Sequence, residues 1–198
     1  MLHCVRNDGA IKIMLVKIVT IGPESTGKSM LCTQLAEHYN TRWVPEYARE
    51  YLMTHGTSYK YEDLYTIAEG QIKGEENIIN KLQSPQPSTL NPKPLFIDTD
   101  LTVIKVWSEF VFNKCDNRIL TQIANRPYHL YLLCNIDLPW VKDELREYPD
   151  LESREKLYHY YKDYLINQHI PWVEISGNYE ERLQKGIDAV NQFILPQR

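Results

Sequence analysis

Apolar residues along the chain fall into two kinds of segment. Short runs rich in β-branched residues predict interior strands, and longer segments with apolar residues three or four positions apart predict amphipathic helices. The predicted strands are 15–21, 42–44, 95–98, 128–134 and 171–175, and the predicted helices are 28–39, 46–53, 64–82, 101–112, 157–165 and 183–194. Strands that alternate with helices indicate β-α-β crossovers, and therefore an α/β fold with a parallel sheet.

Two longer segments show neither pattern. Residues 84–94 contain four prolines and predict a surface loop. Residues 139–154 are charged and irregular, which is typical of a mobile lid over a binding site. No repeat or linker divides the chain, so we expect one domain over residues 14–198, preceded by an N-terminal extension over residues 1–13. The first strand begins directly after Met14, which makes this residue an alternative start of translation.

The composition excludes several classes of protein. The chain has 198 residues, of which 43% are hydrophobic and 24% charged, and its net charge is −4. Lysine and arginine are spread along the chain, which argues against a protein that binds duplex nucleic acid. No apolar run approaches the ~20 residues of a membrane span, so we expect no membrane partner. The four cysteines are widely spaced, which predicts free thiols and a reducing, cytoplasmic location.

The most specific motif begins where the first predicted strand ends. Residues 22–29 read GPESTGKS and match the phosphate-binding pattern G-x-x-x-x-G-K-[ST]. Gly22 and Gly27 permit close approaches that a Cβ atom would block, and the loop N–H groups then converge on phosphate oxygens. Lys28 reaches the terminal phosphates, while the Ser29 hydroxyl binds Mg²⁺. The predicted ATP-binding residues are Gly22, Pro23, Glu24, Ser25, Thr26, Gly27, Lys28, Ser29 and Met30.

A second apolar strand also ends in an acid. Residues 95–98 deliver Asp98 beside the phosphate loop, which predicts a carboxylate that holds Mg²⁺ through a water molecule. Many strands end in aspartate because this residue favours turns, so the prediction depends on the phosphate loop. For Asp100 two interpretations remain open. It either contacts the substrate or caps the following helix.

Phosphoryl transfer also needs cations near the transferred group and a carboxylate near the acceptor hydroxyl. Arg146 and Arg154 lie in the charged segment and are the candidate lid arginines; the alternative is a solvated charged face. Glu46 follows the second strand, whose carboxyl end faces the same sheet edge as the phosphate loop. We therefore predict Glu46 as the base, with Asp98 as the rival. The alternative is that the Glu46 charge only interacts favourably with the N-terminus of the following helix.

Four segments together resemble the ribosylnicotinamide kinase domain of bacterial NadR proteins, a family of P-loop kinases. In the order of that family they are GPESTGKS (22–29), EYAREY (46–51), FIDTD (96–100) and WVKDELR (140–146). The resemblance implies a three-layer P-loop kinase fold with a five-stranded parallel sheet in the order 2-3-1-4-5 and a lid at about 139–154. It implies transfer of phosphate from ATP, with Mg²⁺, to the 5′-hydroxyl of nicotinamide riboside.

The resemblance assigns roles by residue. The implied catalytic residues are Lys28, Glu46, Asp98, Arg146 and Arg154, the implied substrate-binding residues are Glu46, Tyr47, Arg49, Asp98 and Asp100, and the implied metal ligands are Ser29 and Asp98. The chain departs from the family at Glu144, where the lid has glycine, and at Pro45 and Glu76, which replace two aromatic residues around the pyridine ring. Candidates to replace those rings are Trp43, Tyr47 and Tyr65.

Several alternatives to this function stay open. No two histidines have the H-x-G-H spacing that the adenylyltransferase domain of full-length NadR proteins requires. The chain is either a nicotinamide riboside kinase, a kinase of another nucleoside or vitamin alcohol, or a non-catalytic regulatory module that binds ATP. Its expected partners are ATP and a small nucleoside, with a homo-oligomer also compatible with the sequence.

Overall fold

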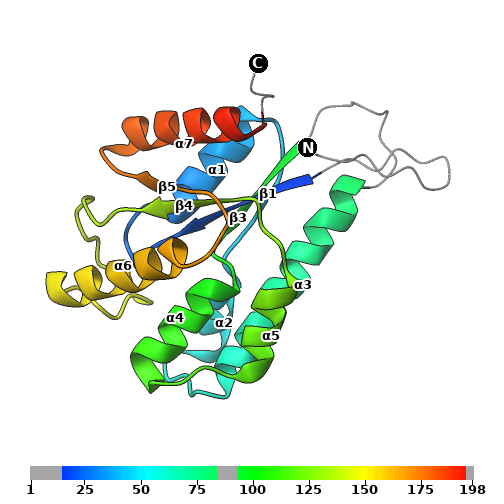
Figure 1. The fold of residues 1–198 in the computed structure, drawn as a ribbon. Helices are drawn as coiled ribbons and strands as arrows, with labels where there is room; N and C mark the ends of the chain where they lie inside the picture. Colours follow the sequence, from blue (N-terminus) through cyan, green and yellow to red (C-terminus); the bar gives the residue numbers. More distant parts are fainter. Residues whose placement is uncertain (1–14, 84–92, 195–198) are drawn as a thin grey trace.

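A parallel sheet lies between two layers of helices in the computed structural model, which describes residues 15–83 and 93–194 (Figure 1). The elements are β1 (Leu15–Ile21), α1 (Lys28–His38), β2 (Trp43–Val44), α2 (Tyr47–His55), α3 (Asp63–Gln83), β3 (Lys93–Asp98), α4 (Leu101–Phe112), α5 (Asn117–Asn125), β4 (Leu130–Cys134), α6 (Leu151–Ile166), β5 (Trp172–Ile175) and α7 (Tyr179–Ile194). The strands pair in parallel in the order β2-β3-β1-β4-β5. The predicted α/β fold and the strand order 2-3-1-4-5 are therefore confirmed.

Helices bury both faces of the sheet, which explains why the strands are mostly apolar rather than alternating between apolar and polar residues. On one face Ile18 of β1 packs with Leu35 of α1 and Val190 of α7. On the other face Val19 of β1 packs with Leu157 of α6. Because neighbouring residues of β1 point to opposite faces, this one strand anchors both layers.

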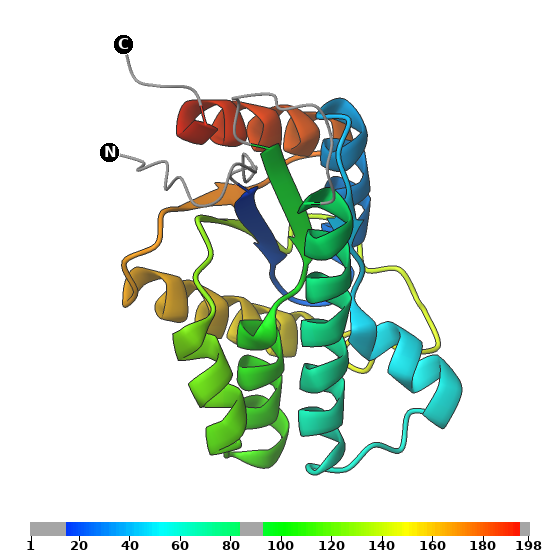
Figure 2. The ribbon, with the colours of Figure 1, turned by 90° about the vertical axis from the view of Figure 1, so that its right-hand side faces the viewer.

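A third apolar cluster lies beyond the sheet. It joins Tyr51 of α2, Ile67 of α3, Ile104 of α4 and Ile119 of α5. Figure 2 shows these helices grouped beyond the end of β3 at which α4 begins. The grouping leaves space between the helices and the phosphate loop, and this space becomes the candidate site.

The structure differs from the pattern-based prediction at two helices. The nine-residue α5 was not predicted, because so short a segment offers few apolar repeats; Asp116 caps it by accepting a hydrogen bond from the Arg118 N–H at 2.8 Å. Residues 151–154 were predicted to be irregular, and this is wrong. They form the first turn of α6, since Asp150 accepts a hydrogen bond from the Ser153 N–H at 2.7 Å and starts the helix.

Smaller differences and agreements concern other segments. β3 begins at Lys93, two residues earlier than predicted. The predicted extension (1–13) and most of the proline-rich loop (84–94) lie outside the described residues. Cys32, Cys115 and Cys134 are free thiols. No described helix is long and apolar enough to cross a membrane.

Candidate active site

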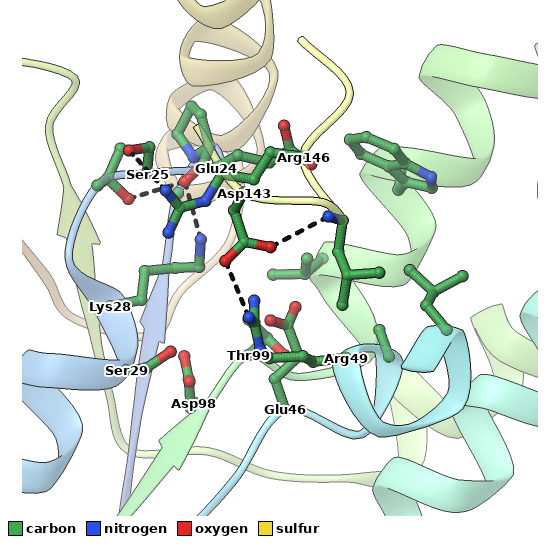
Figure 3. A pocket seen from close by; sticks show the side chains of 18 of the residues that line it. Glu24, Ser25, Lys28, Ser29, Glu46, Arg49, Asp98, Thr99, Asp143 and Arg146 are labelled. Atoms are coloured by element: carbon green, nitrogen blue, oxygen red, sulfur yellow. Dashed lines mark hydrogen bonds and ion pairs between the residues drawn. The ribbon is translucent and has the colours of Figure 1, made fainter. Parts of the chain in front are cut away.

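A cavity of about 610 Å³ lies at the carboxyl ends of β1 and β3. Ligands of parallel sheets bind at this edge because the loops that follow the strands converge there. The phosphate loop forms one wall, the turn before α2 and the helices α3 and α4 form another, and residues 141–147 cover the top (Figure 3). The sequence motifs are thus brought together around one cavity.

The phosphate loop takes a conformation that requires its glycines. Gly22 has φ of +141°, and a Cβ atom there would lie 2.6 Å from the carbonyl oxygen of Cys134. Gly27 has φ of +77° and opens α1. The Thr26 hydroxyl and the Lys28 ammonium each donate a hydrogen bond to the Pro23 carbonyl at 2.8 Å. The loop is therefore closed on itself, with Lys28 lying over its centre.

Asp98 ends β3 beside Ser29, with only 1% of its surface exposed. Burial and, to a smaller extent, the Glu46 charge raise the pKa of Asp98 to about 7, although Lys28 and a hydrogen bond with Ser29 oppose this shift. Its Oδ1 atom has no hydrogen-bond partner among the described residues. An unpartnered buried carboxylate oxygen beside a hydroxyl fits Mg²⁺, which prefers oxygen ligands.

The remaining ligands of such an ion would come from elsewhere. Within the described ranges, no three His, Cys, Asp or Glu side chains converge on one point. Mg²⁺ usually binds through one or two protein ligands and completes its octahedron with water and phosphate oxygens. The pair Ser29 and Asp98 is consistent with that mode.

Glu46 stands at the N-cap position of α2 and lines the cavity. In the part of the chain that the structure describes, its side chain makes no capping hydrogen bond. Figure 3 shows the side chain on the cavity side of the turn before α2, near Asp98. Its charge raises the pKa of Asp98, so the two carboxylates interact. Both interpretations of Glu46 drawn from the sequence stay open, because it stands at the N-terminus of α2 and also lines the cavity.

The segment between β4 and α6 lies directly on the phosphate loop. The Ser25 hydroxyl accepts hydrogen bonds from the Val141 N–H at 2.9 Å and from Arg146 at 3.3 Å. The Glu24 carboxylate accepts from the backbone N–H groups of residues 147 and 148, at 3.0 and 3.2 Å. Arg146 is thereby held against the phosphate loop, and its role as a lid arginine stays a prediction.

A second contact joins this lid to α2. Arg49 forms an ion pair with Asp143, with 2.8 Å between Nη2 and Oδ2. Both residues line the cavity, and Figure 3 shows the pair crossing it. Arg49 is half exposed, so this ion pair contributes little to the free energy of unfolding. Its relevance is that it links α2 to the segment that covers the phosphate loop.

Three predicted site residues point elsewhere. Tyr47 packs its ring against α3, where a Cβ atom on Gly70 would lie 2.0 Å from the ring. Asp100 is buried and caps α4 by accepting a hydrogen bond from the Thr102 N–H at 3.0 Å, which favours the capping interpretation over substrate contact. Arg154 is 6% exposed and donates hydrogen bonds to two carbonyls of the segment that follows β4.

The contacts of Arg154 predict a different defect from that of Arg146. Arg154→Ala is expected to lower the free energy of unfolding by about 1–3 kcal/mol, because buried carbonyl acceptors lose a charged donor. Arg146→Ala, at the cavity surface, should change it by less than about 0.5 kcal/mol but reduce turnover. Urea unfolding of both variants checks this. Equal stability of the two would contradict the anchoring role of Arg154.

Several cavity residues were not predicted from the sequence. Most of them form an apolar recess between α2, α3, α4 and residues 141–147, and these are Leu52, Tyr59, Leu64, Ile67, Val103, Ile104, Trp107 and Leu145. The charged Glu147 also lines the cavity. The Trp107 indole donates a hydrogen bond to the Tyr59 hydroxyl at 2.7 Å, which fixes both rings. No local motif marks these residues, because they are spread over α2, α3, α4 and two connecting segments.

The structure also shows where the residues at the two aromatic positions of the family lie, together with the candidates to replace those rings. Pro45 and Trp43 line the cavity. Glu76 instead accepts a hydrogen bond from Arg126 at 2.6 Å, and the Tyr65 ring stacks on Arg118. Of the three aromatic candidates named from the sequence, Trp43 is the one that the structure places at the cavity.

Comparison with known proteins agrees with this geometry. A family model described as an AAA domain matches residues 17–182. The chain belongs to this family. It is also 25% identical over 194 residues to the trifunctional NAD biosynthesis/regulator protein NadR of Escherichia coli (strain K12), covering 95% of this chain and 45% of that protein. NadR of Salmonella typhimurium is 25% identical over 190 residues, covering 93% and 44%. The resemblance drawn from the motifs is thus confirmed, and the chain spans about half the length of these relatives.

Solved structures with the same fold are P-loop kinases. A NadR protein in complex with NR superposes with a TM-score of 0.75 at 24% identity, covering 93% of this chain and 51% of that one. Thymidylate kinase from Ehrlichia chaffeensis gives 0.59 at 11% identity, covering 89% and 99%. Deoxyadenosine kinase from M. mycoides with bound dATP gives 0.57 at 9% identity, covering 89% and 99%. The predicted P-loop kinase fold is confirmed.

Proposed function

We propose that this protein is an ATP-dependent kinase that phosphorylates the 5′-hydroxyl of nicotinamide riboside. The observation that carries the proposal is the convergence of four groups on one cavity that continues into an apolar recess. These groups are Lys28, Ser29, Asp98 and Glu46. A phosphate loop alone occurs in many ATPases, but a carboxylate opposite it and a recess beyond it are what an acceptor alcohol requires.

The cavity residues divide the reaction between them. Lys28 and the loop N–H groups bind the phosphates of ATP, and Arg146 lies over the loop to balance charge on the transferred group. Ser29 and Asp98 hold Mg²⁺, which neutralises phosphate oxygens when bound. Glu46 orients the 5′-hydroxyl and accepts its proton as the new phosphorus–oxygen bond forms and the bond to the β-phosphate oxygen breaks.

The recess and the relatives both support nicotinamide riboside as the acceptor. The hydrogen-bonded Trp107–Tyr59 pair and aliphatic side chains of α2, α3 and α4 line the cavity, and such a lining suits a flat heteroaromatic ring. The NadR relatives are named for NAD biosynthesis, and one NadR structure was solved with NR. Nicotinamide riboside therefore ranks above other nucleosides, even though Pro45 and Glu76 replace the aromatic pair of the family.

Turnover assays test this proposal. With Mg²⁺ present, nicotinamide riboside is expected to stimulate ADP formation and to yield nicotinamide mononucleotide, measured by coupled spectrophotometry and by mass spectrometry of the product. Adenosine, thymidine and thiamine serve as competing acceptors. Stimulation by one of these and none by nicotinamide riboside would keep the kinase and overturn the substrate. ATP binding without turnover on any acceptor would favour the regulatory module instead.

A further inference from the structure

Gln71 of α3 is a polar residue of the cavity wall that no motif singled out. It is only 3% exposed and lines the cavity. Its Oε1 atom accepts a hydrogen bond from the Tyr47 N–H at 2.8 Å, and its Nε2 atom donates one to the Thr99 carbonyl at 3.0 Å. A backbone N–H needs an acceptor and a carbonyl needs a donor, so these two partners fix which way the amide points.

The two partners of Gln71 each follow a carboxylate of the site. Tyr47 comes directly after Glu46, and Thr99 comes directly after Asp98. One planar amide therefore bridges the two turns that carry these acids. Amide groups are rigid, so a bridge of this kind holds its two ends at a set separation.

The sheet does not supply this connection. β2 has two residues, and its pairing with β3 ends at Val44 opposite Ile97. Glu46 lies two residues beyond the last paired residue of β2, whereas Asp98 is the last residue of β3 and pairs only on its other side, with Thr20 of β1. Their relative position then depends on contacts made outside the sheet, and Gln71 provides a buried one on each side.

The turn after Asp98 needs such support. Thr99 has φ of +63°, in the left-handed region that β-branched residues rarely adopt. Strained residues persist only where the surrounding structure holds them, and they concentrate at functional sites. The Thr99 N–H donates to the Thr20 carbonyl at 3.1 Å, and its own carbonyl is held by Gln71. Loss of the amide frees this turn on one side.

We propose that Gln71 is a positioning residue that sets the placement of Glu46 relative to Asp98, and through it the geometry of phosphoryl transfer. This inference rests on the proposed kinase activity but not on the identity of the acceptor. The competing explanation is that Gln71 only satisfies two buried backbone groups. In that case its loss would lower stability and leave the reaction itself unaffected.

A double-mutant cycle separates the two explanations. The variants are Gln71→Leu, Gln71→Glu, Glu46→Gln and Glu46→Gln combined with Gln71→Leu. Gln71→Glu keeps an oxygen that accepts from the Tyr47 N–H but has no N–H group to donate to the Thr99 carbonyl. It takes the place of Gln71→Leu in the cycle if the leucine variant folds poorly. Gln83→Leu, an exposed position on the same helix, is the control. The measurements are kcat, the KM for ATP, ADP affinity by calorimetry and the melting temperature.

Positioning predicts a specific pattern. Gln71→Leu should lower kcat by about tenfold to a hundredfold, because small misplacements of reacting groups cost that much. The KM for ATP and the ADP affinity should stay within about twofold, since the phosphate loop is untouched. In the Glu46→Gln background the same substitution should lower kcat by less than about threefold, because the group it positions is gone.

Other outcomes overturn the inference. An unchanged kcat in both Gln71 variants would contradict it, as would a loss in the double variant equal to the product of the two single losses. A wild-type protein that phosphorylates no acceptor would overturn the kinase proposal, and this inference with it. Wild-type activity therefore distinguishes failure of the positioning role from failure of the function.

Discussion

Lys28→Ala is expected to lower turnover by about a thousandfold, the upper range for removing one preorganised charge from a transition state. The Lys28 ammonium donates to the Pro23 carbonyl at 2.8 Å and lies over the loop that binds phosphate. Its charge lowers the pKa of Asp98, which interacts with Glu46, and the charges of these two carboxylates otherwise repel the phosphates. Alanine leaves that repulsion uncompensated, so both ATP affinity and kcat should fall.

The same substitution should leave the fold intact. Lys28 is the first residue of α1 and is partly exposed, so its loss opens no cavity in the core. Thermal unfolding should therefore give a melting temperature close to that of the wild type. Lys73→Ala, at an exposed position of α3, is the matched control for removing a lysine and should keep full activity. Wild-type turnover in Lys28→Ala would contradict the assignment of the phosphate loop.

The sequence predicted those parts of the site that a single segment encodes. The phosphate loop needs adjacent residues with fixed roles, so its pattern is visible without the fold. Asp98 and Glu46 were predicted for a related reason, because acids that directly follow strands of one parallel sheet meet at the same edge. The structure places Lys28, Asp98 and Glu46 around one cavity, as these patterns required.

Side-chain direction within helices was less predictable. Tyr47 and Arg49 are two positions apart on α2, and only Arg49 faces the cavity. Arg154 was grouped with Arg146 because both lie in a charged segment, but the first turn of α6 directs Arg154 toward backbone carbonyls. Composition gives the charge of such a segment, whereas the phase of the helix decides where each charge points.

The acceptor side of the cavity was not visible in the sequence. Leu52, Trp107 and Gln71 belong to three different helices, and each has an ordinary helical surrounding in the chain. They become neighbours of the phosphate loop only because α2, α3 and α4 pack together beyond the sheet. This part of the cavity is thus formed by tertiary packing, and no single segment of the sequence encodes it.

The electrostatics of the carboxylate pair connect catalysis with stability. Burial and the Glu46 charge raise the pKa of Asp98 to about 7, far above its ordinary range. A carboxyl whose pKa is raised by folding stabilises the protein when protonated, and this contribution is lost as the pH rises through about 7. Removing the Glu46 charge lowers that pKa. At pH 8 and without added metal, the free energy of unfolding of Glu46→Gln should therefore be at least as large as that of the wild type.

Glu46→Gln is expected to lower kcat by about a hundredfold or more, because glutamine keeps the shape of the side chain but accepts no proton. ADP affinity should remain, since the phosphate loop and Lys28 are unchanged. A mere helix-terminus charge would behave differently: its loss would cost less than about 1 kcal/mol of stability and leave turnover alone. Steady-state kinetics with calorimetric ADP titration separate these two roles.

Asp98→Asn is the control that distinguishes base from metal ligand. Asp98 has a buried oxygen without a partner among the described residues and interacts with Ser29, so its loss should raise the Mg²⁺ concentration needed for half-maximal turnover. Glu46→Gln should leave that concentration unchanged. If Glu46→Gln instead keeps full activity, while Asp98→Asn loses turnover even at saturating Mg²⁺, the proton is accepted by Asp98. The dependence on Mg²⁺ thus assigns each carboxylate its role, because only one of the two adjoins the Ser29 hydroxyl at the start of α1.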